Sequence, residues 1–143
     1  MSGFAFRLEK VLEWRKTQLE LQEVEYRREL ENLAAIDRKR VQIEAAGQDA
    51  ERVVRAWNPV CGDDLAALAT FRTHVRNQEL ELLAPRAQCV QQVEAQQGRM
   101  LEARRRLRLL ERLKERQRAE WQSGRDREIE AVASESYLAQ WRP

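Results

Sequence analysis

The sequence predicts an all-α protein that folds as a long two-helix antiparallel coiled-coil hairpin, a single domain over residues 1–143. Two stretches carry apolar residues at alternating spacings of three and four, and a short segment rich in turn-forming residues, 57–64, separates them. The composition agrees, because 35% of the residues are charged while the chain holds five Gly and three Pro. That balance is typical of long solvated helices.

The first helix is expected over about residues 5–56, with Ser2 as a candidate cap. Gly47 lies in its apolar seam and should weaken the helix locally. The seam that defines this helix runs through Leu8, Leu12, Leu19, Tyr26, Leu33, Ile36, Ile43, Ala50, Val54 and Trp57.

The turn is expected over residues 57–64, because Pro59 and Gly62 end the first helix and Asp63 or Asp64 caps the second. The second helix is expected over about residues 64–122. Its seam runs through Leu65, Leu68, Val75, Leu82, Cys89, Val93, Met100, Ala103, Leu107 and Leu110.

Two features interrupt the second half of the chain. Pro85 removes one helical hydrogen bond, but the heptad phase carries through it, so a kink is expected near Pro85 instead of a new element. Ser123 and Gly124 should loosen the helix. The C-terminal extension, residues 123–143, is then expected to fray or to fold on a partner.

The turn sets a register in which Trp57 meets Leu65, Gly47 meets Val75, and Leu12 meets Leu110. In this register every polar seam residue meets an apolar one, and long polar stems pack there while their heads reach water. The polar seam positions are Arg15, Gln22, Glu29, Arg40, Arg72, Glu79, Arg86, Gln96 and Lys114.

Catalytic chemistry is not expected. His74 is the one histidine, and no phosphate-binding glycine loop or nucleophile motif is present. Cys61 and Cys89 lie too far apart along a helix for a disulfide, and two free thiols fit a reducing compartment. No apolar run approaches the roughly 18 residues of a membrane span, and no signal peptide is recognisable. We therefore expect a non-enzymatic cytoplasmic protein with no metal, no cofactor and no transmembrane segment.

The net charge of +2 hides a basic stretch, because residues 99–118 hold nine Lys or Arg and three Glu. A solvated helix face is the default interpretation. A surface for nucleic acid, an anionic membrane or an acidic protein is the alternative.

Three segments resemble the flagellar export protein FliJ family. The start of the chain, Phe4-Ala5-Phe6-Arg7-Leu8-Glu9-Lys10-Val11-Leu12-Glu13-Trp14-Arg15, is similar to that family's F-x-F-x-L-x-x-V-L-x-x-R pattern. The later segment Leu110-Glu111-Arg112-Leu113-Lys114-Glu115-Arg116 is similar to its L-E-K-L-K-E-R-type segment. Phe71 and Val75, after the turn, resemble its F-x-x-x-L patch. The resemblance covers most of the chain, and Pro85 departs from the family's second helix.

The resemblance implies a component of the flagellar type III protein export apparatus, similar to the central stalk of rotary ATPases. The implied partners are the hexameric export ATPase, the export gate membrane protein and export chaperones, at the cytoplasmic face of the inner membrane, with no nucleic acid. The gate-facing patch would be Phe71 and Val75. The ATPase-facing end would comprise Phe4, Phe6, Leu8, Val11, Leu12, Arg15, Leu110, Leu113, Lys114, Arg116 and Trp121.

Phe4 and Phe6 lie outside the seam phase, so they either face a partner or close the end of the coil as a hydrophobic staple does. Three other functions stay open. They are the equivalent stalk of a virulence-type III secretion system, a basic coiled coil that binds nucleic acid or a membrane surface, and a homo-oligomeric scaffold.

Overall fold

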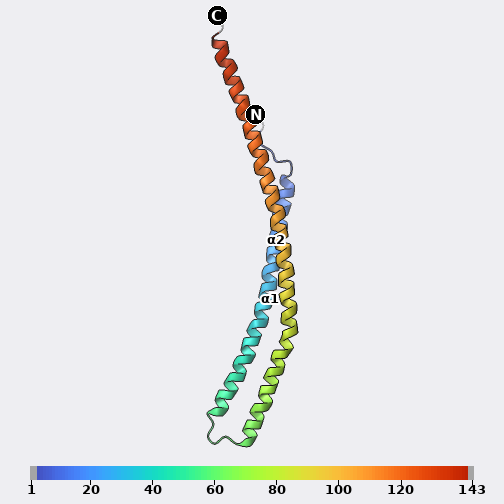
Figure 1. Ribbon diagram of the computed structural model, residues 1–143, viewed down its shortest axis with the longest axis vertical. Helices are drawn as coiled ribbons and strands as arrows, with labels where there is room; N and C mark the ends of the chain where they lie inside the picture. The colour runs from blue at the N-terminus through green and yellow to red at the C-terminus, as the bar shows by residue number, and fades with distance from the viewer. Residues whose placement is uncertain (1–2, 142–143) are drawn as a thin grey trace. The chain divides into compact units, whose positions relative to one another are not determined.

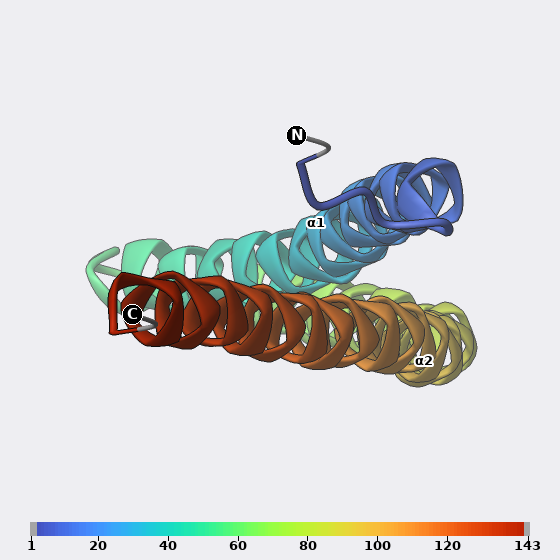
Figure 2. The same ribbon diagram turned by 90° about the horizontal axis from the view of Figure 1, so that it is seen from above.

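The computed structural model describes residues 3–141 and contains two helices, α1 (Glu9–Arg55) and α2 (Gly62–Gln140) (Figure 1). No strand occurs in the described part of the chain. The view at right angles draws the same two helices with no further element packed on them (Figure 2). The predicted all-α helical hairpin is confirmed.

The helices contribute to two compact units. Unit 1 comprises Met1–Leu21 and Leu101–Pro143, and unit 2 comprises Gln22–Met100. Unit 2 contains the turn, while unit 1 contains both chain ends. Each unit is a segment of antiparallel helix pair with its own packing.

Helix α1 begins at Glu9, so the prediction of a start near Ala5 is wrong. Residues 3–6 are non-helical, and a turn at Arg7 and Leu8 is closed by a 3.1 Å hydrogen bond from the Glu9 amide to the Phe6 carbonyl. The non-helical segment lets Phe6 pack between the helices with Leu12 and Leu107, where Phe6 is 8% exposed. Burial of this side chain is the reason that the helix does not start earlier. The cap predicted at Ser2 lies outside the described residues.

The turn covers residues 56–61, and the capping of α2 differs from the prediction. Asp64 lies within the first turn of the helix, and its carboxylate accepts hydrogen bonds from the Cys61 thiol at 3.0 Å and the Cys61 amide at 3.2 Å. These hydrogen bonds hold the pKa of Asp64 below its ordinary value. This geometry is the back-reaching half of a capping box, with Cys61 at the cap position.

Helix α2 is longer than predicted, because it continues through Ser123 and Gly124 to Gln140. One glycine costs a helix interior only about 1 kcal/mol, and the neighbouring Arg, Glu and Ala residues favour helix. The helix also runs unbroken through Pro85, as predicted, while the kink at that residue stays a prediction.

The register is confirmed in unit 2 where Gly47 faces Val75. A Cβ atom at Gly47 would lie 3.2 Å from the Val75 Cγ1 atom, so the missing side chain lets the helices approach. The layer next to the turn was predicted to pack Trp57 on Leu65, but both side chains are about half exposed, at 48% and 55%. The first buried layer lies beyond them, at Leu68.

Two polar seam residues keep exposed heads, as predicted, since the side chains of Arg72 and Arg86 are 51% and 39% exposed, and each also pairs with a carboxylate of α1. In unit 2 the Arg72 Nε atom lies 2.6 Å from Glu51 Oε1, and the Arg86 Nε atom lies 2.8 Å from Asp37 Oδ1. Each acid is the neighbour of the predicted apolar partner, Ala50 or Ile36. The side chain of each arginine therefore crosses the apolar residue and ends in a hydrogen bond to a carboxylate. The hydrogen bond to Asp37 raises the pKa of Arg86.

One prediction about the seam is wrong. Gln96, 6% exposed, donates hydrogen bonds to the Gln22 side-chain oxygen at 2.6 Å and to the Gln22 carbonyl at 3.3 Å, so two polar residues meet inside unit 2. The contact is diagonal, because Gln22 and Gln96 belong to adjacent layers of the seam. Glu29 also departs from the prediction, because one of its carboxylate oxygens is buried without a hydrogen-bond partner in the described structure.

Candidate functional site

An apolar cluster closes the helix pair in unit 1. Leu12, Phe6 and Leu107 form its buried centre, at 2%, 8% and 8% exposure. Half-buried apolar side chains pack around them: Phe4, Leu19, Leu110 and Leu113. Of the two interpretations of Phe6, closure of the coil end therefore agrees with its burial.

Trp121 extends this cluster along α2. Its ring centroid lies 6.0 Å from that of Phe4 at an interplanar angle of 50°, and the Arg125 guanidinium carbon lies 5.4 Å from the same indole centroid. Nearby, the Lys114 Nζ atom pairs with Glu9 Oε2 at 2.8 Å. A hollow of about 610 Å³ beside these groups is lined by Phe4, Ala5, Phe6, Glu9, Lys114, Arg118, Trp121 and Gln122.

The residues that the resemblance assigned to an ATPase-facing end separate into two groups in unit 1. Three are exposed to solvent: Leu8, Val11 and Arg116. The others are buried or half-buried in the helix pair: Phe4, Phe6, Leu12, Arg15, Leu110, Leu113, Lys114 and Trp121. Most of the assigned residues therefore hold the end together and present little surface of their own.

Trp14 is a surface residue that was not predicted from the sequence. Its side chain is 51% exposed, and the Arg15 guanidinium carbon lies 4.6 Å from its ring centroid. Val11 and Leu21, at 41% and 54% exposure, lie on the same helix at spacings of three and seven residues from Trp14. That spacing is a second apolar stripe beside the seam, and it was available in the sequence.

Helix α2 continues past Trp121 to Gln140 as an overhang, which comprises residues 122–140. Figure 1 draws it in orange to red beyond the N-terminal end of α1. Ile129 and Val132 are 57% and 62% exposed. Together with Trp121, Gly124, Arg125, Glu128 and Ala133 they line a groove of about 790 Å³. These positions continue the seam face of α2 where α1 supplies no residue to cover it.

The two residues assigned to a gate-facing patch lie in unit 2. Phe71 is 36% exposed, and its ring centroid lies 6.4 Å from that of His74. Val75 is half-buried against Gly47. Phe71 is therefore the member that offers surface, while Val75 belongs to the seam.

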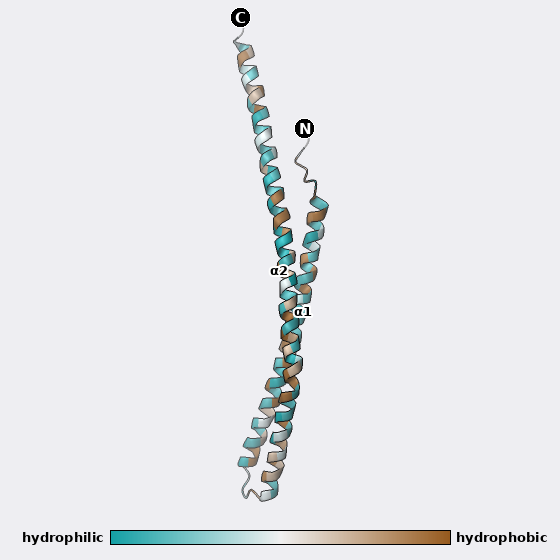
Figure 3. Ribbon diagram, turned by 45° about the vertical axis from the view of Figure 1, so that its right-hand side comes forward, coloured by the Kyte–Doolittle hydropathy of each residue, from teal (hydrophilic) through white to brown (hydrophobic). Residues whose placement is uncertain are grey.

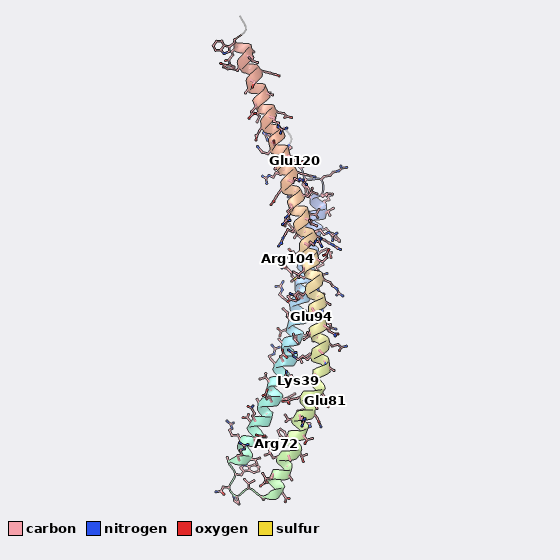
Figure 4. The ribbon with its side chains drawn as sticks, viewed as in Figure 1. Lys39, Arg72, Glu81, Glu94, Arg104 and Glu120 are labelled. Atoms are coloured by element: carbon pink, nitrogen blue, oxygen red, sulfur yellow. The ribbon has the colours of Figure 1, made fainter. Side chains whose placement is uncertain are left out.

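Four arginines of the basic stretch, Arg104, Arg105, Arg108 and Arg112, lie together on α2 in unit 1, on the side away from the seam. A shallow hollow of about 370 Å³ is lined there by Leu101, Arg104, Arg105, Arg108, Leu109 and Arg112. Figure 4 labels Arg104 on this part of the helix. Glu102 forms ion pairs with two arginines, at 3.9 Å between its Oε2 atom and Arg105 Nη1 and at 3.2 Å between its Oε1 atom and Arg106 Nε. Arg108 and Arg112 form no ion pair within residues 3–141. The two leucines are about half exposed, at 48% and 56%.

Both cysteines are free thiols, as predicted, with Cys61 exposed and Cys89 half-buried. Among the described residues there is no group of three His, Cys, Asp or Glu side chains that could hold a metal ion. Neither α1 nor α2 is apolar enough over a sufficient length to cross a membrane. Hydropathy colouring shows hydrophobic residues interspersed with hydrophilic ones along both helices (Figure 3).

No protein-family model, curated protein or solved structure matches this chain. The features that bear on function are the apolar cluster, the overhang and the resemblance of the segments around Phe4, Phe71 and Leu110.

Proposed function

We propose that this protein is a non-enzymatic stalk of the flagellar type III export apparatus, located at the cytoplasmic face of the inner membrane. It binds the hexameric export ATPase and links the enzyme to the export gate and to export chaperones. The observation that carries the proposal is the overhang of α2, whose seam face stays uncovered at Ile129 and Val132. Beside it, the apolar cluster around Leu12 closes the helix pair.

This pairing of a closed coil end with an uncovered helix suits a part that enters a ring opening. A single helix has a diameter of about 10–12 Å with its side chains, so it fits a narrower opening than a helix pair does. Apolar residues at helical spacing give such a tip a stripe to pack against ring subunits. The buried residues of the segments that resemble the FliJ family then act indirectly. They hold together the helix pair from which the overhang projects.

The direct test adds the purified full-length chain to the cognate export ATPase and measures hydrolysis and ring assembly. We expect stimulation of both. The double variant Ile129→Ser/Val132→Ser should lose most of the stimulation, because it removes the apolar stripe and leaves the cluster at Leu12 intact. The matched control is Val24→Ser/Val41→Ser, which removes two similarly exposed valines of unit 2, at 55% and 64% exposure.

A folded wild-type protein that neither binds nor stimulates the ATPase would contradict the proposal. Equal loss in both double variants would contradict the role of the overhang. For the gate, Phe71→Ala should weaken capture of the export gate membrane protein, while Leu80→Ala, on the same helix and 55% exposed, should not. The same ATPase assay with a virulence-type enzyme distinguishes the two secretion systems.

A further inference from the structure

The outer face of α2 in unit 1 is exposed along its length and has an ordered charge pattern. Its residues recur at spacings of three, four and seven on the side away from the seam, so they lie along one line of the helix. All are exposed in the structure: Leu101, Arg105, Arg108, Arg112, Glu115, Ala119, Ser123, Asp126, Glu130, Ala133 and Tyr137. We call this set the outer face.

The charge along the outer face changes sign on the two sides of Ala119, with one exception. Before Ala119 the charged members are Arg105, Arg108 and Arg112 together with Glu115, and after it they are Asp126 and Glu130. An exposed apolar residue ends the face on each side, Leu101 at 48% exposure and Tyr137 at 60%. Outward from Ala119, three pairs of positions are complementary: Arg112 with Asp126, Arg108 with Glu130, and Leu101 with Tyr137. Two further pairs join a charged residue to a small uncharged one, namely Glu115 with Ser123 and Arg105 with Ala133.

This symmetry is the pattern that a helix needs to pair with an antiparallel copy of itself. A two-fold axis at Ala119 brings each residue before it opposite the matching residue after it. We propose that the outer face is a docking surface for a second copy of this chain, forming an antiparallel α2–α2 pair centred on Ala119. Arg112 then meets the second copy's Asp126, Arg108 meets its Glu130, and Leu101 meets its Tyr137.

The local structure suits this partner. The ion pairs of this stretch join Arg105 and Arg106 to Glu102, Lys114 to Glu9, and Arg116 to Glu120. Among the described residues none involves Arg108, Arg112 or Glu130, so their charges are available. The hollow of about 370 Å³ between Leu101 and Arg112 can receive a side chain of the second copy. Ala119 at the centre allows the two helix axes to approach closely, because its side chain is a single methyl group.

A second copy explains the outer face better than nucleic acid or a membrane does. Phosphates and anionic lipids would use the arginines, but they would repel Asp126 and Glu130 on the same line of the helix. The proposed pair uses both signs. It also leaves the groove at Ile129 and Val132 open, because that groove continues the seam face and shares only Ala133 with the outer face. The inference is therefore independent of the proposed function.

The test uses the full-length chain in sedimentation equilibrium over a series of concentrations at low salt. We expect a monomer–dimer equilibrium that weakens as salt rises, since the contact is largely ionic. Arg108→Glu places a carboxylate opposite the second copy's Glu130 at both symmetry-related contacts. Glu130→Arg places two guanidinium groups together in the same way. Each variant should weaken the dimer about tenfold, because two attractive contacts become repulsive ones.

Mixing the two variants gives the sharpest outcome. A heterodimer of Arg108→Glu with Glu130→Arg has two attractive contacts. In one, the introduced glutamate at position 108 faces the introduced arginine at position 130, and in the other the native Arg108 faces the native Glu130. The mixture should therefore dimerise better than either variant alone. Arg28→Glu and Glu81→Arg are matched controls in unit 2, both at exposed positions, and should leave the equilibrium unchanged. Glu81 is labelled in Figure 4.

Cysteine cross-linking tests the direction of pairing, in a background that carries Cys61→Ser and Cys89→Ser. Leu101→Cys should form disulfides with Tyr137→Cys in a mixed sample and not with itself. A wild-type chain that stays monomeric at low salt overturns the proposal. So does a mixture of charge variants that dimerises no better than each variant alone, or preferential Leu101→Cys self-linking, which indicates parallel pairing. Dimer-independent binding of duplex DNA or anionic vesicles, lost in Arg108→Glu, would assign the face to those ligands instead.

Discussion

The two units differ in the balance of apolar and polar contacts between their helices, although unit 1 also has the Lys114–Glu9 ion pair and unit 2 also buries Leu68. In unit 1 the space between the helices is filled by an apolar cluster centred on Phe6, Leu12 and Leu107. In unit 2 a buried Gln96 bonds to Gln22, and arginines cross the seam to reach carboxylates. Hydrophobic burial is non-directional, whereas hydrogen bonds and ion pairs have defined partners. Each layer of unit 1 is therefore expected to contribute more to the free energy of unfolding than a layer of unit 2. The polar contacts of unit 2 are expected to specify which residues of the two helices face one another.

The largest effect on stability is expected from a substitution in the apolar cluster of unit 1. Leu12→Ala should lower the free energy of unfolding by about 2–4 kcal/mol, because Leu12 is 2% exposed and its removal leaves a cavity against Phe6 and Leu107. Urea denaturation measures the change. Leu21→Ala, on the same helix at 54% exposure, is the matched control and should change stability by less than about 0.5 kcal/mol.

Hydrogen exchange locates the Leu12→Ala effect. Amides of α1 before Leu21 and of α2 near Leu107 should lose protection, while those beside Gly47 should change little. A uniform loss over both units would show that the units do not differ as their packing indicates.

The seam residues could be predicted from the sequence because a heptad repeat reports which face of a helix is covered. The pairing of Gly47 with Val75 followed from the position of the turn. The ion pairs of Arg72 and Arg86 could not be predicted by matching layers alone, because a long side chain ends one residue away from the position it crosses. At the candidate site, the predicted start of α1 near Ala5 was wrong. Burial of the Phe6 side chain stabilises the fold by more than the helix propensity of the few residues before Glu9 would.

A second prediction concerns the least satisfied residue of unit 2. Glu29→Leu should raise the free energy of unfolding by about 1–2 kcal/mol, since one Glu29 oxygen is buried without a partner in the described structure and the position predicted to face it is Val93. Thermal unfolding measures the gain. Glu25→Leu, one helical turn earlier and exposed, should give no comparable gain. Equal effects at both positions would mean that general hydrophobicity, not the buried carboxylate, sets the change.

The glycines sharpen the comparison by separating helix propensity from close packing. Gly98→Ala should stabilise the protein by about 1 kcal/mol, because nothing lies within 4 Å of its added Cβ atom. Gly47→Ala should gain less or lose stability, because its Cβ atom would lie 3.2 Å from Val75 Cγ1. Denaturant midpoints of the two variants provide the test. A gain at Gly47 equal to that at Gly98 would show that the close approach in unit 2 is not constrained.

The smallest expected effect is at the first turn of α2, where Asp64 binds back to Cys61. Asp64→Ala should increase hydrogen exchange severalfold at the amides of residues 61–65, because it removes the carboxylate that accepts from the Cys61 amide and thiol. Asp63→Ala is the matched control, since Asp63 shares the first turn and its favourable helix dipole without those hydrogen bonds.

The pH dependence of this effect has a definite sign. The pKa of Asp64 is lowered in the folded chain by its hydrogen bonds to Cys61, so its contribution is present above the pKa of the unfolded chain and disappears as pH falls through the lowered value. The difference between wild type and Asp64→Ala should therefore be full at neutral pH and vanish in strong acid. A difference that persists after the carboxylate is protonated would show that backbone geometry, and not the charged cap, orders this end of unit 2.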